Sequence, residues 1–330
     1  MTILIALDAM GGDHAPAETV EGAVQAVREF GLEVALVGPP DVLEAELARH
    51  GPRPAAIRVV AASESIGMDE APAQAVRQKR DASINAAMRL VKGGEAAAVV
   101  SAGNTGAVMA SALFVLGRVG DIERPALGAF FPSTQRGVLM LDVGANADCK
   151  PSYMIQFARM GSLFMERLFG IGEPRVGLLN IGEEENKGNE LTQEVYRALR
   201  KSSLNFVGNV EGKDIATGQV DVAVMDGFTG NVAIKMSEGV VGLMFSEMRS
   251  ALSSRLHYRL AALVLRPAFR AMRRRLDYAE YGGVPLLGVN GVVIIAHGRS
   301  DATAVKNALR AAGEVAASGI VEAMAEAFKR

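Results

Sequence analysis

Short apolar runs alternate with longer amphipathic runs along the chain, and this alternation predicts the fold. Apolar runs such as Glu33–Val37 and Ala96–Val100 show little polar alternation, which is typical of strands covered on both faces. The predicted strands are 2–7, 33–37, 57–60, 96–100, 127–131, 137–143, 175–180, 205–207, 220–225 and 292–296. Helical patterns separate them, among them 71–91, 106–116, 152–169, 189–200 and 301–328. Such strand–helix alternation predicts a three-layer, doubly wound α/β fold around a mostly parallel sheet.

Composition narrows the class of protein. The chain has 330 residues, 49% of them hydrophobic and 22% charged, and no repeat or clear linker interrupts it. We therefore expect residues 1–330 to form a single two-lobed α/β unit with a large core. One cysteine excludes a disulfide framework, and no signal peptide or membrane-spanning stretch is expected. A formal net charge of −2 argues against general nucleic-acid binding.

Polar, glycine-rich segments follow several predicted strands. Ligands of doubly wound folds bind at the carboxyl ends of strands, so we expect these loops to lie on one rim of the sheet and to share a site. Ordinary turns also need Gly and Asn, but that alternative explains the accompanying Asp, His and Lys less well. The segments are DAMGGDH at 8–14, SAGNTGA at 101–107, LDVGAN at 141–146, NIGEEENKGNE at 180–190, MDGFTGN at 225–231 and AHGRS at 296–300.

Two of these loops open a helix and have the composition of an anion site. Gly103, Asn104 and Thr105 lie at one helix start, and Thr229–Asn231 at another. Backbone N–H groups at a helix N-terminus, together with a hydroxyl, bind phosphate well. Simple helix capping by Thr or Asn is the alternative.

Individual side chains in the loops suggest further chemistry. Lys187 could pair with a phosphate or polarise a carbonyl, although three adjacent glutamates also fit a solvated charged loop. His14 could act as an acid or base, or cap a helix. Asp8 and Asp13 resemble metal ligands, but no second ligand cluster accompanies them, so no metal site is expected. Cys149 is expected to be a buried structural thiol.

Residues 249–275 contain eight arginines and no acid. Leu252, Leu256, Leu260 and Leu263 repeat at helical spacing, and Pro267 is expected to start or break a helix. The segment 245–282 is therefore predicted to be a basic amphipathic helical hairpin that contacts an anionic membrane or an acidic partner. A surface helix packed on the body or on a second subunit is the alternative.

The motifs LDAMGGDHAP, SAGNTGA, LDVGAN, CKP, NIGEEENKGNE, GNVEG, DGFTGN and IIAHGRS occur in one order between residues 3 and 325. Together they closely resemble the bacterial acyl-ACP:phosphate acyltransferase family, PlsX. The resemblance implies a fold related to phosphotransacetylase and isocitrate-dehydrogenase-like enzymes, and a homodimer without a cofactor. It also implies that inorganic phosphate takes the acyl chain from acyl carrier protein early in phospholipid synthesis. The acyl phosphate would then serve a membrane glycerol-3-phosphate acyltransferase.

Under this interpretation each candidate residue has a role. Lys187 and Asn231 would balance charge as phosphate attacks the thioester, and His14 would position phosphate or the leaving thiolate. Phosphate and substrate would be bound by Asp13, Gly103, Asn104, Thr105, Asn146, Thr229, Gly230 and His297. The membrane or carrier would be contacted by Leu256, Arg259, Leu260, Leu263, Arg266, Arg270 and Arg273. A cytoplasmic enzyme at the inner face of the plasma membrane is expected. The alternatives are a short-chain phosphotransacetylase that uses acyl-CoA and a non-catalytic phosphate- or lipid-binding regulator.

Overall fold

The apolar runs form the strands of one continuous sheet. The computed structural model describes residues 3–135, 137–276 and 282–329, and in it eleven strands follow the order β3-β2-β1-β4-β11-β10-β5-β6-β9-β7-β8. Their bounds are β1 Leu4–Asp8, β2 Glu33–Gly38, β3 Ile57–Ala61, β4 Ala98–Ser101, β5 Ala126–Phe131, β6 Val138–Leu141, β7 Val176–Leu179, β8 Phe206–Val210, β9 Val222–Val224, β10 Val284–Leu287 and β11 Val292–Ile295. The predicted mostly parallel α/β sheet is confirmed.

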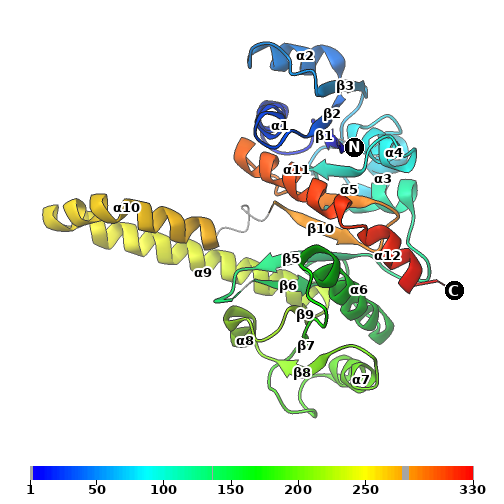
Figure 1. Cartoon of the computed structure of the whole chain (residues 1–330), viewed down its shortest axis with the longest axis vertical. Coiled ribbons are helices and arrows are strands. Elements are labelled where there is room, and N and C mark those ends of the chain that lie inside the picture. Colours follow the sequence, from blue (N-terminus) through cyan, green and yellow to red (C-terminus); the bar gives the residue numbers. More distant parts are fainter. Residues whose placement is uncertain (1–2, 136, 277–281, 330) are drawn as a thin grey trace.

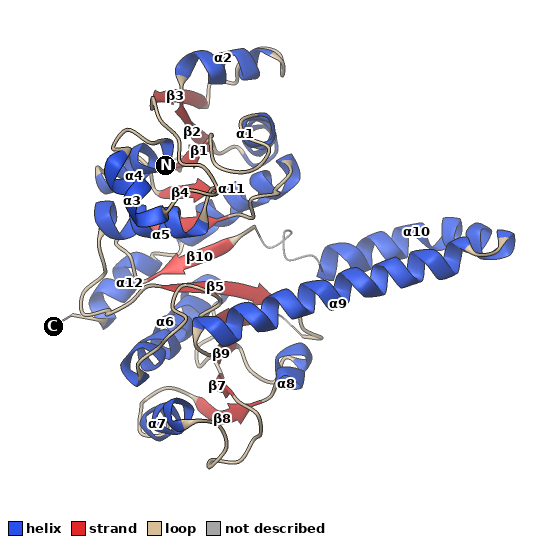
Figure 2. Ribbon diagram, turned by 180° about the vertical axis from the view of Figure 1, so that it is seen from behind, coloured by secondary structure: helices blue, strands red, loops and turns tan. Residues whose placement is uncertain are grey.

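Helices cover both faces of this sheet (Figures 1 and 2). They are α1 Ala17–Phe30, α2 Pro40–Ala48, α3 Pro72–Gln78, α4 Ser83–Lys92, α5 Thr105–Ser111 with a π-helical continuation Ala112–Leu116, α6 Pro151–Phe169, α7 Glu190–Leu199, α8 Gly212–Thr217, α9 Gly227–Ser253, α10 Leu256–Leu276, α11 Ala302–Ala317 and α12 Ile320–Ala327. One core cluster joins α1 and α11 to α6 through the sheet, and Phe157 and Phe164 are fully buried within it. Burial of each such ring contributes about 2–3 kcal/mol to folding.

The strands of the two halves run in opposite directions. β10 is antiparallel to both β11 and β5, and β5 is antiparallel to β6, whereas the remaining pairs are parallel. Three successive reversals therefore separate β11 from β6. The expectation that all the polar loops share one rim is wrong, because the loops after β1, β4 and β11 form one group and those after β6, β7 and β9 form another.

Two further predictions need correction at the level of elements. The expected hairpin at 245–282 is longer at its start, since α9 already begins at Gly227, and residues 277–281 lie outside the described chain. Pro267 lies inside α10 without ending it. Strand β10 was not predicted because Pro285 interrupts a four-residue run, and proline is ordinarily depleted in central strands.

Candidate functional site

The loops after β1, β4 and β11 pack against one another, as expected for adjacent parallel strands. The backbone N–H of Asp13 donates to the carbonyl of Gly298 at 2.8 Å. Asn104 caps α5, because its Oδ1 accepts from the Ala107 N–H at 3.1 Å, while its Nδ2 donates to the carbonyl of Met68 at 2.7 Å. Both ends of the Asn104 amide are thus engaged in structure, as the capping alternative proposed.

Asp8 is buried beneath this first group of loops. Its Oδ2 accepts a 2.7 Å hydrogen bond from the Ser101 hydroxyl, whose oxygen in turn accepts from the Gly103 N–H at 3.1 Å. Its Oδ1 is buried with no hydrogen-bond partner in the described part of the chain. Burial is the main cause that raises the pKa of Asp8 above its usual 3.8, and the hydrogen bond from Ser101 is among the effects that oppose it.

Asp142 plays the corresponding part in the second group of loops, and sequence reasoning missed it. Its Oδ1 accepts from the N–H groups of Leu127, Gly144 and Ala145 at 3.0–3.1 Å. Its Oδ2 accepts from both the N–H and the Nδ2 of Asn146, at 2.7 and 2.9 Å. Burial is the main cause that raises the pKa of Asp142, and the hydrogen bonds from the Ala145, Leu127 and Gly144 N–H groups and from the Asn146 side chain oppose it. The available signal was its place in LDVGAN, at the end of a predicted strand.

The start of α9 is built against this turn. The Gly227 N–H donates to the Asn146 carbonyl at 2.8 Å, and a side chain at Gly230 would collide with the backbone of Asp142. Asp226 caps the helix: its two carboxylate oxygens accept from the N–H and the hydroxyl of Thr229 at 2.9 and 2.7 Å. A carboxylate therefore already occupies this helix start, and Thr229 is engaged by it.

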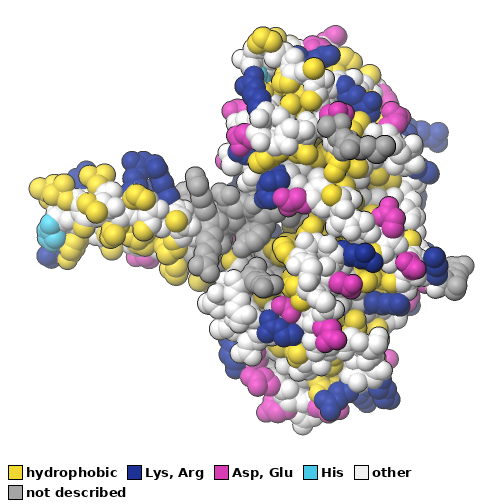
Figure 3. All heavy atoms as spheres, in the orientation of Figure 1, with side chains coloured by type: hydrophobic (Ala, Val, Ile, Leu, Met, Phe, Trp, Pro, Cys, Tyr) yellow, Lys and Arg dark blue, Asp and Glu magenta, His cyan; other side chains and the backbone are white. Residues whose placement is uncertain are grey.

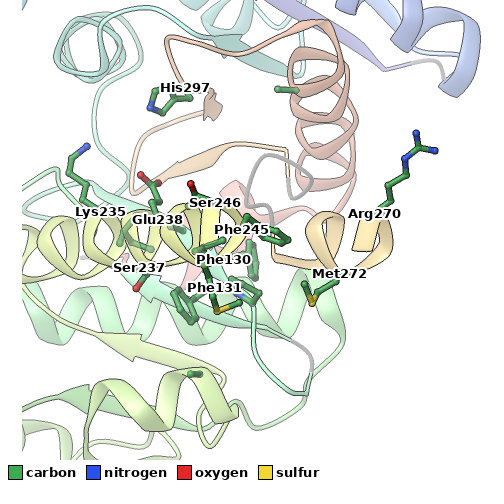
Figure 4. Close-up of a pocket in the computed structure, with 18 of the residues that line it drawn as sticks. Phe130, Phe131, Lys235, Ser237, Glu238, Phe245, Ser246, Arg270, Met272 and His297 are labelled. Carbon is green, nitrogen blue, oxygen red and sulfur yellow. The ribbon is translucent and has the colours of Figure 1, made fainter. Parts of the chain in front are cut away.

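A single cavity of about 1930 Å³ connects both groups of loops with the hairpin. Three of the predicted loop residues line it: Thr105 and His297 from the first group, and Asn231 from the second. Lys235 and Glu238 on α9 line it too, although neither was singled out from the sequence. Figure 4 shows both side chains pointing from α9 toward the side on which His297 lies. The His297 Nδ1 accepts from the Arg299 N–H at 3.1 Å, so in the neutral ring the proton resides on Nε2.

The other predicted loop residues do not line this cavity. Asp13 and His14 are exposed on the loop after β1, and Lys187 is exposed on the loop after β7, where its backbone N–H bonds to the Glu184 carbonyl. Gly103, Asn104, Asn146, Thr229 and Gly230 form the turns that support its walls.

The hairpin of α9 and α10 projects from the body as an arm (Figures 1–3). Leu256, Leu260 and Leu263 are 72%, 58% and 64% exposed. The cavity continues into the hairpin, where Arg259, Leu263, Arg266 and Arg270 line it while Leu256 and Leu260 do not. The side chain of Arg273 lies outside the described residues. The arm thus exposes leucines and arginines together, as the sequence predicted.

The described residues give little support to a reactive cysteine, a metal site or a membrane-spanning helix. Burial, as the first cause, raises the pKa of the Cys149 thiol to about 11, which disfavours the thiolate. No three His, Cys, Asp or Glu side chains of the described chain gather as metal ligands would. Among the helices that the structure describes, none combines the length and the apolar character needed to cross a bilayer.

Comparison with solved structures identifies the class of fold. A phosphotransacetylase from Streptococcus pyogenes matches 95% of this chain and 94% of its own with a TM-score of 0.62 and 18% identity. A 4-hydroxythreonine-4-phosphate dehydrogenase from Klebsiella pneumoniae matches 96% of this chain and all of its own, with a TM-score of 0.57 and 13% identity. At these identities the likeness shows the fold alone, and it confirms the predicted phosphotransacetylase-like α/β class.

Comparison of sequences identifies the family. The family model described as "Fatty acid synthesis protein" matches residues 3–323. A phosphate acyltransferase of Heliobacterium modesticaldum is 54% identical over 324 residues, which are 98% of this chain and 96% of the relative. One of Geobacter sulfurreducens is 49% identical over 322 residues, 98% of this chain and 93% of the relative. The chain belongs to this fatty acid synthesis protein family and is an acyltransferase of lipid biosynthesis, so the resemblance to PlsX is confirmed.

Proposed function

We propose that the protein transfers the acyl group of acyl-ACP to inorganic phosphate and releases acyl phosphate and free carrier protein. The observation that carries this proposal is the composition of the cavity. Its polar lining includes Thr105, Asn231, Lys235, Glu238 and His297, and its remaining walls are mostly apolar apart from the arginines of the hairpin and several serines. A site that brings a phosphate to the carbonyl of a fatty acyl thioester needs both.

The reaction requires no covalent enzyme intermediate. A phosphate oxygen attacks the thioester carbonyl carbon, the negative charge moves to the carbonyl oxygen, and the C–S bond then breaks as that charge returns. The leaving thiolate takes up the proton that the attacking hydrogen phosphate gives up, so the products are acyl phosphate and the free thiol. Phosphate is already an anionic nucleophile at neutral pH, so positioning and stabilisation of the oxyanion supply the catalysis.

The side chains at the polar end suit these tasks. The Thr105 hydroxyl and the Asn231 amide can donate to phosphate, and Lys235 can balance its charge. The Nε2–H of His297 can donate to phosphate or to the developing oxyanion. Lys187, His14 and Asp13 remain candidates for the carrier side of the site, because all three are exposed on loops at strand ends.

The proposal is tested by measuring how the reaction rate of two variants, Asn231→Ala and Thr105→Val, depends on the phosphate concentration. Each substitution removes one hydrogen-bond donor to the phosphate. Because the loss of a hydrogen bond to a charged group costs about 1.4 kcal/mol, we expect the KM for phosphate to rise about tenfold. The KM for the acyl donor should change much less. Lys213→Ala is the control, because Lys213 does not line the cavity and pairs with Glu183 and Glu211 on the surface. An unchanged phosphate KM in both variants contradicts the assignment.

The hairpin, in this proposal, contacts acidic carrier protein or the anionic inner face of the plasma membrane. Its exposed leucines and arginines support both. Homodimer formation and delivery of the product to a membrane glycerol-3-phosphate acyltransferase rest on the family resemblance. A short-chain phosphotransacetylase acting on acyl-CoA would share the fold, but it would have no need for the apolar and basic arm.

A further inference from the structure

Asp142 is the buried carboxylate on which the second group of loops is assembled. Its two oxygens accept hydrogen bonds from the backbone of β5 at Leu127 and from the turn 144–146. All the donors are N–H groups, so the side chain at this position has to offer an acceptor on both of its oxygens. A single side chain therefore fixes the turn to the neighbouring strand.

The turn passes this constraint on to the start of α9. Asn146 donates through Nδ2 to Asp142 and to the Pro125 carbonyl, at 2.9 and 2.8 Å. The backbone carbonyl of Asn146 then accepts from the N–H of Gly227, the first residue of α9, at 2.8 Å. A Cβ at Gly227 would lie 2.8 Å from Oδ2 of Asp142. The start of the helix thus packs directly against the carboxylate.

Asn231 is placed in the cavity by this arrangement. It follows Gly227 by one helical turn, so it lies on the same face of α9. A Cβ at Gly144 would lie 3.8 Å from Cγ of Asn231, so the Asn231 side chain lies beside the turn. This side chain lines the cavity and makes no hydrogen bond to another residue within the described part of the chain. Its direction therefore depends on how the backbone at the helix start is held.

We propose that Asp142 is a positioning residue for phosphate binding, which holds the start of α9 through the turn 144–146 so that the Asn231 amide points into the cavity. Asp142 is fully buried and does not line the cavity, so it acts through other residues. This inference rests on the proposed function, which supplies the ligand. A donor that is held in place before the anion arrives binds it more tightly, because ordering a mobile side chain on binding weakens the affinity.

The test is a double-mutant cycle on the KM for inorganic phosphate, with Asp142→Asn, Asn231→Ala and the double variant. Asparagine has the shape of aspartate but places an NH₂ group where Asp142 has an acceptor, so some of the donors lose their partner. We expect Asp142→Asn to raise the phosphate KM by up to about tenfold, the change expected for Asn231→Ala. The KM for palmitoyl-ACP should change much less.

The double variant distinguishes a positioning role from a merely structural one. Because both substitutions act on the same amide, its phosphate KM should be about that of Asn231→Ala alone, and not raised by the product of the two single effects. An unchanged phosphate KM in folded Asp142→Asn, or effects that multiply in the double variant, would overturn the inference.

Asp221→Asn is the matched control. The Asp221 carboxylate also supports this half of the sheet, since it accepts from the Arg175 backbone N–H at 2.8 Å and from its guanidinium at 3.0 and 3.1 Å. Asp221 precedes β9, whereas α9 follows that strand, and it does not line the cavity. Asp221→Asn should lower stability without changing the phosphate KM. A rise equal to that in Asp142→Asn would show a general effect of destabilisation and would also overturn the inference.

A binding measurement separates this inference from the proposed reaction. Calorimetric titration with inorganic phosphate alone gives a Kd without any acyl donor, and the same cycle applies to it. A wild-type protein without turnover whose variants lose phosphate affinity in this non-additive way would refute the reaction and keep the role of Asp142. An active wild-type protein whose variants show additive losses, or none, would do the reverse. Asn146→Ala removes the side-chain donor to Asp142 and replaces Asp142→Asn in the cycle if that variant does not fold.

Discussion

Asp8 and Asp142 are two buried carboxylates at the ends of strands that differ in how many hydrogen bonds they accept. Both end a strand and hold the loop that follows. Asp142 accepts five hydrogen bonds, whereas Asp8 accepts a side-chain bond from Ser101 and leaves Oδ1 buried without a partner. An unpaired buried oxygen on a charged group costs folding free energy. Asp8 is therefore the less well satisfied of the two.

Asp8→Asn should change how stability depends on pH. The raised pKa means that the folded protein holds its proton above pH 3.8 while the unfolded chain has lost it, so the unfolding free energy falls as pH rises through this window. An asparagine side chain does not titrate, so the variant does not lose unfolding free energy in this window, and its side-chain oxygen can still accept the hydrogen bond from Ser101. Relative to wild type, the variant should therefore gain stability from about pH 4 upward until the folded pKa is passed, as urea unfolding at several pH values would measure. A stability difference independent of pH would contradict this account of Asp8.

Lys187 lies outside the cavity, so its predicted role in stabilising the oxyanion depends on how the carrier protein docks. Its side chain is exposed, and only its backbone is fixed by the loop after β7. If it stabilises the oxyanion when the carrier docks, Lys187→Ala should lower kcat by about 100-fold. Single-turnover kinetics with Lys213→Ala as the control would measure this. A kcat near that of wild type would remove Lys187 from the mechanism.

At the scale of elements, the hairpin combines two surfaces on one pair of helices. Residues of both α9 and α10 line the cavity, and the exposed side chains of the hairpin include leucines and arginines. The sequence predicted the basic amphipathic character from spacing and charge. It also predicted a helix start at Thr229–Asn231, but not that this helix continues unbroken from Gly227 to Ser253 and so forms the first helix of the hairpin.

Charge reversal on the hairpin should weaken binding of the carrier. The double variant Arg259→Glu with Arg266→Glu reverses two positive charges on the hairpin to negative, and we expect the Kd for acidic acyl carrier protein to rise about tenfold in low salt, without lipid. The effect should shrink as salt is added, because screening weakens exposed charges. Arg200→Glu at the end of α7 is the control. An unchanged Kd, accompanied by lost binding to anionic vesicles, would assign these arginines to the membrane instead.

At the scale of the whole molecule, the two halves meet in one sheet whose strands reverse direction three times. Apolar runs such as Val292–Ile295 are buried on both faces, so the sequence predicted nearly every strand and the α/β class. Strand direction depends on pairing between distant segments, which local pattern does not encode, and so the two groups of loops were expected on one rim. Thr105, Asn231 and His297 were found from loop composition. Lys235 was missed because it follows the loop by a helical turn.

The most direct test of the central claim is the formation of acyl phosphate by the purified protein, with inorganic phosphate and either palmitoyl-ACP or palmitoyl-CoA as donor. We expect phosphate-dependent formation of palmitoyl phosphate from the carrier-bound donor and little from the CoA thioester. Turnover of the CoA thioester alone, or of neither donor, would contradict an acyl-ACP:phosphate acyltransferase.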